Sequence, residues 1–161
     1  MTPRRMYPFS PDVADYLKAA GWRPGRKVTT RHWESLLRHA NNPVYPVVVE
    51  FLQEFGGLTI YHPNPGHPET DDRDICISPS IAAEHNAIEE DGLIDMNARA
   101  GCALCAIGTA REHHILLLMA ADGRVFGAMS DLLWLFGMSG CDAIETLCTS
   151  NRWKHLHPPE D

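Results

Sequence analysis

The sequence lacks the long apolar runs of a membrane protein. Its longest apolar run covers residues 115–121, far short of the roughly 20 residues that a helix needs to cross a bilayer. The opening stretch MTPRRMYPFSPD has two arginines but no apolar core behind them, so it does not read as a secretory signal. We therefore expect a cytoplasmic protein with no membrane segment.

Positive charge is also scarce. The sequence has 14 Lys and Arg residues against 21 Asp and Glu residues, which gives a formal net charge of -7. Such a surface repels phosphate backbones and attracts basic partners. Nucleic-acid binding is therefore not expected. The nine histidines make this charge sensitive to pH, because most histidines gain a proton below about pH 6.

Two common catalytic motifs are missing. The sequence contains neither the Gly-x-Ser-x-Gly turn of a hydrolase nucleophile nor a glycine-rich phosphate loop that ends in Lys and Ser or Thr. The acidic segment at residues 69–74 lacks the central glycine of a calcium loop. No catalytic residue, metal or cofactor is therefore expected.

The cysteines are few, odd in number and mostly set in apolar segments, which is typical of buried free thiols. Two alternatives involve Cys102 and Cys105. With His32 and Glu34 they weakly match the zinc site of nucleobase deaminases, although a strand would point the two thiols to opposite faces. A redox pair would need a helix N-terminus beside Cys102, and none is visible. The five residues are Cys76, Cys102, Cys105, Cys141 and Cys148.

The stretch VVVEFLQEFGGLTI at residues 47–60 organises the predicted fold. Its apolar side chains recur at helical spacing, with Glu50, Gln53 and Glu54 between them. Gly56 can supply a left-handed cap, and the residues from Leu58 onward favour a strand. The stretch therefore predicts a helix that leads directly into the first strand of a sheet.

Similar signals divide the rest of the chain. Asp122-Gly123 predicts a tight hairpin turn, and Ser-Pro steps or a serine cap predict helix starts. Helices are expected over residues 11–20, 30–39, 46–55, 79–91 and 131–136, and around 144–148 behind Ser139. Strands are expected over residues 58–61, 75–77, 103–107, 113–120 and 124–128. Residues 62–72 are expected to form an exposed loop, residues 93–100 a loop, and residues 151–161 a polar tail.

This order predicts an α+β fold. A single domain over residues 1–161, with its core at about 9–150, would have a central antiparallel sheet with helices at both ends and on one face. Two acidic segments are candidate contacts for a basic partner, although a merely solvated face is the simpler alternative. The candidate residues are Asp71, Asp72, Asp74, Glu89, Glu90 and Asp91.

Several short motifs, in order, carry a family resemblance. They are FSPDVADYL at residues 9–17, GW-x-PGR at 21–26, FL-x-EFGGL at 51–58, AIG at 106–108, DGRVF at 122–126 and the Gly137-x-Ser139 helix start. Together the motifs resemble the third family of the SUKH superfamily over residues 9–150.

The resemblance implies an immunity protein of bacterial polymorphic toxin systems, which binds and blocks a cognate toxin domain, often a nuclease or a deaminase. It carries over no catalytic residue. Arg26 and Glu54 are expected to form an ion pair that fixes the first loop on the central helix. A regulatory scaffold of the same fold, and less so a zinc hydrolase or deaminase, are the alternatives. The family's recurrent residues, interpreted as structural, fall at Trp22, Arg26, Glu54, Phe55, Gly56, Gly57, Gly108 and Gly123.

Overall fold

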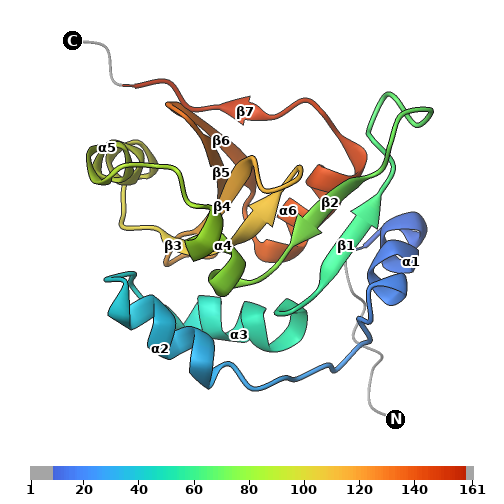
Figure 1. The fold of residues 1–161 in the computed structure, drawn as a ribbon. Coiled ribbons are helices and arrows are strands. Elements are labelled where there is room, and N and C mark those ends of the chain that lie inside the picture. The colour runs from blue at the N-terminus through green and yellow to red at the C-terminus, as the bar shows by residue number, and fades with distance from the viewer. Residues whose placement is uncertain (1–8, 159–161) are drawn as a thin grey trace.

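The computed structural model describes residues 9–158. Its centre is one seven-stranded antiparallel sheet, in which each strand pairs with the next along the chain (Figure 1). The strands are β1 (Thr59–His62), β2 (Arg73–Cys76), β3 (Cys105–Ala110), β4 (Ile115–Met119), β5 (Val125–Met129), β6 (Leu132–Gly137) and β7 (Lys154–His155). The helices are α1 (Pro11–Ala19), α2 (Arg31–His39), α3 (Pro46–Phe55), α4 (Pro79–His85), α5 (Glu90–Ala100) and α6 (Gly140–Thr149). The predicted α+β class with a central antiparallel sheet is confirmed.

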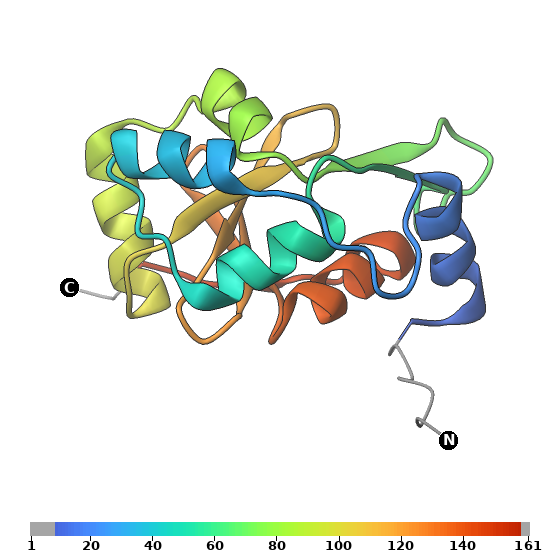
Figure 2. The ribbon, with the colours of Figure 1, turned by 90° about the horizontal axis from the view of Figure 1, so that it is seen from below.

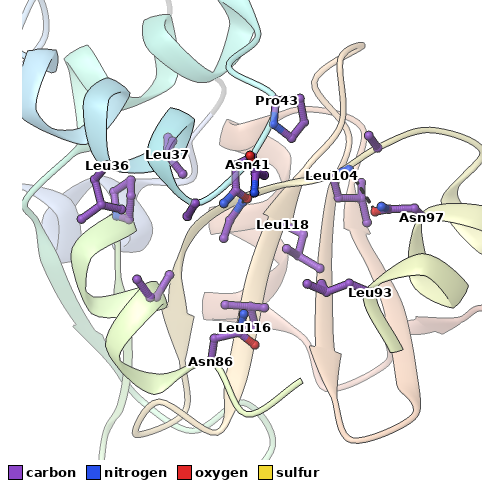
Figure 3. Close-up of a pocket in the computed structure, with 17 residues that line it drawn as sticks. Leu36, Leu37, Asn41, Pro43, Asn86, Leu93, Asn97, Leu104, Leu116 and Leu118 are labelled. Carbon is purple, nitrogen blue, oxygen red and sulfur yellow. Dashed lines mark hydrogen bonds between the residues drawn. The ribbon is translucent and has the colours of Figure 1, made fainter. Parts of the chain in front are cut away.

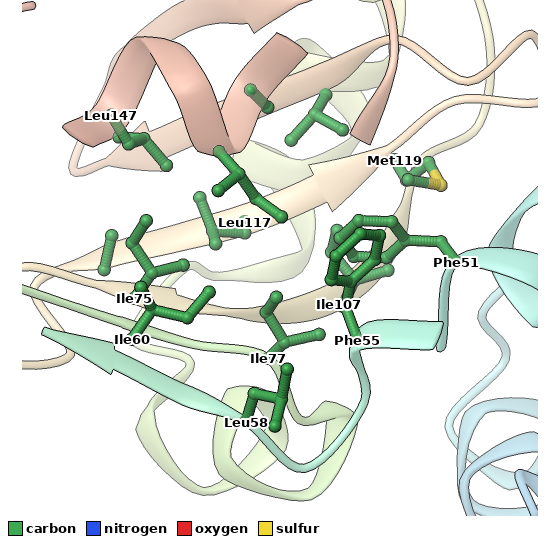
Figure 4. Packing of buried hydrophobic residues seen from close by; sticks show 14 of the residues in the cluster. Phe51, Phe55, Leu58, Ile60, Ile75, Ile77, Ile107, Leu117, Met119 and Leu147 are labelled. Carbon is green, nitrogen blue, oxygen red and sulfur yellow. The ribbon is translucent and has the colours of Figure 1, made fainter. Parts of the chain in front are cut away.

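Two apolar clusters cover the two faces of the sheet. Phe51 and Phe55 of α3 and Leu147 of α6 pack on one face, together with residues of α1 and α2 (Figure 4). Met96 of α5 and Ala82 of α4 pack on the other face. Every residue of β4 is buried, as expected for a strand covered on both sides.

The exit from α3 differs from the prediction. Gly56 has an ordinary φ of -60°, and the left-handed residue is Gly57, with φ 84°. A Cβ on Gly56 would lie 2.4 Å from the carbonyl oxygen of Leu52 and 2.4 Å from the Trp33 ring. The glycine therefore allows α2 to pack closely on the end of α3, and the predicted left-handed cap at Gly56 is wrong.

Helix α5 replaces a predicted loop. The helix expected over residues 79–91 ends at His85, and a new helix begins at Glu90, so that Gly92 lies in its first turn. Met96 and Ala100, four residues apart, bury its inner face. Gly101 then ends the helix with φ 81°, in the left-handed conformation that glycine favours.

The segment after β5 is a strand where a helix was predicted. Met129 pairs with Leu132, so Ser130 and Asp131 form a two-residue turn, with Ser130 at φ 56°. The alternation of β6 places Leu133 in one apolar cluster and Trp134 against the other. Burial of alternate side chains on the two faces of the sheet therefore favours a strand over a helix in this segment.

Part of the predicted polar tail is built into the sheet. Lys154 and His155 pair with β6 as strand β7, and the ring of Trp153 lies 5.4 Å from Trp134 and 4.9 Å from Phe136. Residues 159–161 of the predicted tail lie outside the described residues.

The loop between β1 and β2 is exposed only in part. His62, predicted to begin this loop, ends β1 instead and is 2% exposed. Asn64 in the loop is 7% exposed, whereas residues 66–72 face solvent, as predicted. Within residues 9–158, no helix is long and apolar enough to cross a membrane.

Candidate functional site

The first acidic segment lies on the hairpin of β1 and β2. Asp71 and Asp72 are exposed at the end of the connecting loop, just before β2. Asp74 is half-buried, and its carboxylate accepts a hydrogen bond of 2.7 Å from the backbone N–H of Glu112. Asp71 and Asp72 are therefore available to a partner, whereas Asp74 supports the neighbouring turn between β3 and β4.

The second acidic segment begins helix α5. Glu89 is its N-cap residue, and Glu90 and Asp91 lie in its first turn, all three exposed. Carboxylates at this position also interact favourably with the positive end of the helix. Figures 1 and 2 both place α5 and the β1–β2 loop at opposite ends of the molecule. The structure therefore does not bring the six predicted acidic residues together on one face.

The turn between β3 and β4 has an unusual backbone. Three consecutive residues with side chains, Arg111, Glu112 and His113, have φ values of 55°, 56° and 67°. Such residues are uncommon in the left-handed region and concentrate at functional sites. The N–H of Arg111 donates to the carbonyl oxygen of Asp74 at 3.0 Å, so the first acidic segment holds this turn in place.

A cavity of about 470 Å³ opens beside this turn. Its wall includes Arg73, Arg111, Trp134 and Trp153. The guanidinium of Arg111 lies 4.9 Å from the centre of the Trp153 ring and donates to Asn151 Oδ1 at 2.8 Å. Burial lowers the pKa of Arg111, and the nearby charge of Arg73 lowers it further. These four of the eight lining residues come from separate segments, and no motif in the sequence points to them.

A second cavity, of about 290 Å³, lies between α2, α4, α5 and β3 (Figure 3). Leu36, Leu93 and Leu116 contribute to its apolar wall. Asn97 accepts a hydrogen bond from the backbone N–H of Leu104 at 3.0 Å, so its amide completes the wall. Among the described residues, the lining contains no acid, base or thiol, and these residues therefore offer no group for acid–base or nucleophilic catalysis.

The thiol pair gives no sign of redox function. Burial raises the pKa of Cys105, at the start of β3, to about 12. A redox nucleophile needs the opposite shift. Cys102 lies in the turn after α5 and precedes the strand, so the prediction that the two thiols point to opposite faces of one strand does not apply.

The weak zinc match with His32 and Glu34 gains no support from the geometry. Both residues lie on α2, and the His32 ring packs 4.5 Å from Trp33. Across residues 9–158, no three His, Cys, Asp or Glu side chains gather in a way that could hold a metal ion.

The recurrent motif residues join the first loop to α3. Arg26 donates to the carbonyl oxygens of Glu54 and Gly56 at 2.7 and 2.9 Å, while the Glu54 carboxylate accepts from Trp22 Nε1 at 3.3 Å. The expected Arg26–Glu54 ion pair is therefore replaced by bonds to the backbone. Trp22 also stacks on Phe55 at 6.3 Å.

The recurrent glycines lie at turns and close approaches. Gly57 and Gly123 have positive φ values of 84° and 94°. A Cβ on Gly108 would lie 2.1 Å from the carbonyl oxygen of Cys76, where β3 passes β2. All three positions have geometric reasons for glycine.

Comparison with known proteins adds one finding. No curated protein and no solved structure matches the chain significantly. The family model of the SUKH-3 immunity protein matches residues 9–150, which is nearly the whole of the described chain. The chain therefore belongs to the SUKH-3 immunity protein family.

Proposed function

We propose that this protein is a non-catalytic immunity protein of a bacterial polymorphic toxin system. It binds a cognate toxin domain of the nuclease or deaminase type in the cytoplasm and blocks it directly. The observation that carries the proposal is the family match over residues 9–150. The sequence lacks both a Gly-x-Ser-x-Gly turn and a phosphate loop, which agrees with a role in binding.

The proposed mechanism is steric and electrostatic. A toxin that acts on nucleic acid presents a basic cleft, and carboxylates can occupy the positions of phosphates there. The net charge of -7 favours approach to such a cleft. Asp71 and Asp72 are the better candidate contacts because they are exposed and belong to the β1–β2 loop, which lies at one end of the molecule (Figure 1).

The second acidic group has a local role that competes with binding. Glu89, Glu90 and Asp91 stabilise the start of α5 through the helix dipole. They lie at the opposite end of the molecule from the β1–β2 loop (Figure 2). Substitutions there can therefore be compared with substitutions of Asp71 and Asp72. A single small interface would use one group or the other.

The test begins with co-expression of the protein and the toxin domain encoded beside its gene. Rescue of growth, together with a stoichiometric complex from the same cells, supports direct neutralisation. Failure of both, against an intact and lethal toxin, would favour the regulatory scaffold. Stoichiometric metal in the purified protein would favour a zinc enzyme.

Charge reversal then locates the interface. Asp71→Lys with Asp72→Lys is expected to weaken toxin binding about tenfold or more, because favourable pairs become repulsive. Glu89→Lys with Glu90→Lys makes the same change in charge at the other end and is expected to change affinity less than about twofold. The reverse result would move the interface to α5.

A further inference from the structure

The cavity beside the β3–β4 turn combines two cations with apolar walls. Arg73 and Arg111 line one part, and Trp134, Trp153, Met129 and Ile115 supply the apolar walls. Exposed Glu112 and His114 of the turn complete the lining. Trp153 is fixed in place, because its Nε1 donates to the carbonyl oxygen of Ser150 at 3.0 Å and its ring packs on Phe136. The cavity therefore has a firm aromatic wall.

Among the described residues, neither guanidinium group forms an ion pair, although Glu112 also lines the cavity. Within residues 9–158, the ion pairs involve other side chains, and no carboxylate lies within 4.0 Å of Arg73 or Arg111. The nearby Asp74 carboxylate accepts the Glu112 N–H. The Nε atom of Arg73 is buried without a hydrogen-bond partner. Two arginines that line one cavity and form no ion pair there are suited to an anionic group.

We propose that this cavity binds a carboxylate side chain of the protein partner, with an apolar or aromatic group of the partner against Trp153 and Trp134. Arginine guanidinium groups bind carboxylates through paired hydrogen bonds. Buried aromatic and arginine residues also carry much of the energy of protein interfaces. The described lining contains no lysine and no hydroxyl group, which commonly join arginine at phosphate sites.

The location fits the proposed function, on which the identity of the partner rests. Arg73 follows Asp72 directly in the sequence, so the cavity adjoins the exposed acidic residues that precede β2. The interface would then combine an acidic rim with a cationic pocket. Such a mixed charge pattern favours one partner over others that are merely basic.

The pocket is tested first with a small probe that needs no toxin. Phenylacetate carries a carboxylate and an aromatic ring, and phenylacetamide is its uncharged analogue. Phenylacetate is expected to shift the indole N–H signals of Trp134 and Trp153 in a saturable manner in NMR spectra, while Trp22 and Trp33 stay unchanged. Phenylacetamide is expected to bind about tenfold more weakly, because it lacks the charge.

A variant and its control test whether Arg73 carries the effect. Arg73→Gln should weaken phenylacetate binding about tenfold, and Arg38→Gln, which removes the same charge from exposed α2, should leave it unchanged. Equal binding of the amide, or no shift at the two indoles, would overturn the proposal. Displacement of phenylacetate by a lower concentration of inorganic phosphate would instead identify a phosphate site and overturn it too.

The toxin domain provides the second arm. Arg73→Gln is expected to weaken its binding about tenfold or more, and Arg38→Gln to change it less than about twofold. Unchanged toxin affinity in Arg73→Gln would overturn the pocket while leaving the immunity function intact. If the wild-type protein binds phenylacetate but not the toxin, the pocket is supported and the proposed immunity function is not. Thermal unfolding of each variant confirms that it is folded.

Discussion

Arg26 donates a hydrogen bond of 2.7 Å to the backbone carbonyl oxygen of Glu54. A second bond of 2.9 Å reaches the carbonyl oxygen of Gly56. The last carbonyl groups of a helix have no partner within the helix, so the guanidinium of the first loop caps the C-terminal end of α3. Arg26 is half-buried, and this burial lowers its pKa.

Replacement of Arg26 by alanine is expected to destabilise the protein by about 2–3 kcal/mol. The change leaves the two carbonyl groups at the end of α3 without their charged donor, and hydrogen bonds to charged groups contribute about 1.5–3 kcal/mol. Urea unfolding at equilibrium measures this loss directly. No loss of stability would show that the contact contributes nothing to the fold.

Glu54→Gln separates this capping from an ion pair. Its carboxylate accepts a long bond of 3.3 Å from Trp22 Nε1, and an amide oxygen can accept the same bond. The substitution is therefore expected to cost less than about 0.5 kcal/mol and to be additive with Arg26→Ala. A coupling free energy above about 1 kcal/mol would favour an ion pair instead.

Gly56→Ala is expected to destabilise the protein by about 3 kcal/mol. Its Cβ would meet the Leu52 carbonyl oxygen and the Trp33 ring at 2.4 Å, and overpacking of this kind costs about 1–3 kcal/mol or more. Gly25→Ala is the matched control. It has φ 80° and no atom within 4 Å of the new Cβ, so only backbone strain of about 1–2 kcal/mol is expected. A larger loss at Gly25 in thermal unfolding would contradict close packing as the role of Gly56.

Elements with strong local signals were predictable from the sequence. Ser139 caps α6 by accepting the Asp142 N–H at 3.1 Å. The Asp122-Gly123 turn joins β4 and β5, with Gly123 at φ 94°. In each case the residue types within a few positions determine the backbone conformation, so the sequence alone contains the needed information.

Elements that depend on distant partners were not predictable. Residues 132–137 are as apolar as a short buried helix, and only pairing with β5 and β7 makes them a strand. Gly92 indicates a helix end in the sequence, so α5 is not predicted. The helix forms because Met96 and Ala100 are buried against the sheet. Strand β7 has two residues, too few for any periodic signal.

The cavity could not be predicted for a similar reason. Arg73, Arg111 and Trp153 belong to three segments that meet because the sheet brings β2 beside β3 and the chain returns after α6. No spacing in the sequence encodes that meeting. The acidic residues were visible as two segments, but their separation across the molecule was not.

The buried thiols are expected to resist alkylation. Burial raises the pKa of both Cys105 and Cys148 to about 12, and the thiolate is the reactive form. In the folded protein at pH 8, iodoacetamide should therefore label half-buried Cys102 well before either of them. Mass spectrometry of digested samples measures the order, and urea-unfolded protein, in which all five thiols react, is the control. Early labelling of Cys105 would contradict its burial.

The stability of the fold is expected to fall on acidification, in part because of His62. Its side chain is almost fully buried, and its Nδ1 donates to the Pro63 carbonyl oxygen at 2.8 Å. Burial lowers the pKa of His62 below its ordinary value of 6.5, although the Pro63 bond offsets part of the shift. The folded protein therefore holds this imidazole neutral at a pH where the unfolded chain protonates it.

The sign of the effect follows from proton binding. Well above pH 6.5 neither state binds the proton, and the contribution of His62 to stability is complete. As pH falls below 6.5 the unfolded state binds more protons, so the free energy of unfolding decreases by at most about 1.4 kcal/mol per pH unit until the folded pKa is reached. His62→Asn keeps a donor for Pro63 and should reduce the loss measured by urea unfolding between pH 7.5 and pH 5.5, about one unit either side of the ordinary pKa. His67→Gln, at an exposed position of the same loop, should keep the wild-type loss. Equal losses in wild type and His62→Asn would show that other groups govern the acid sensitivity.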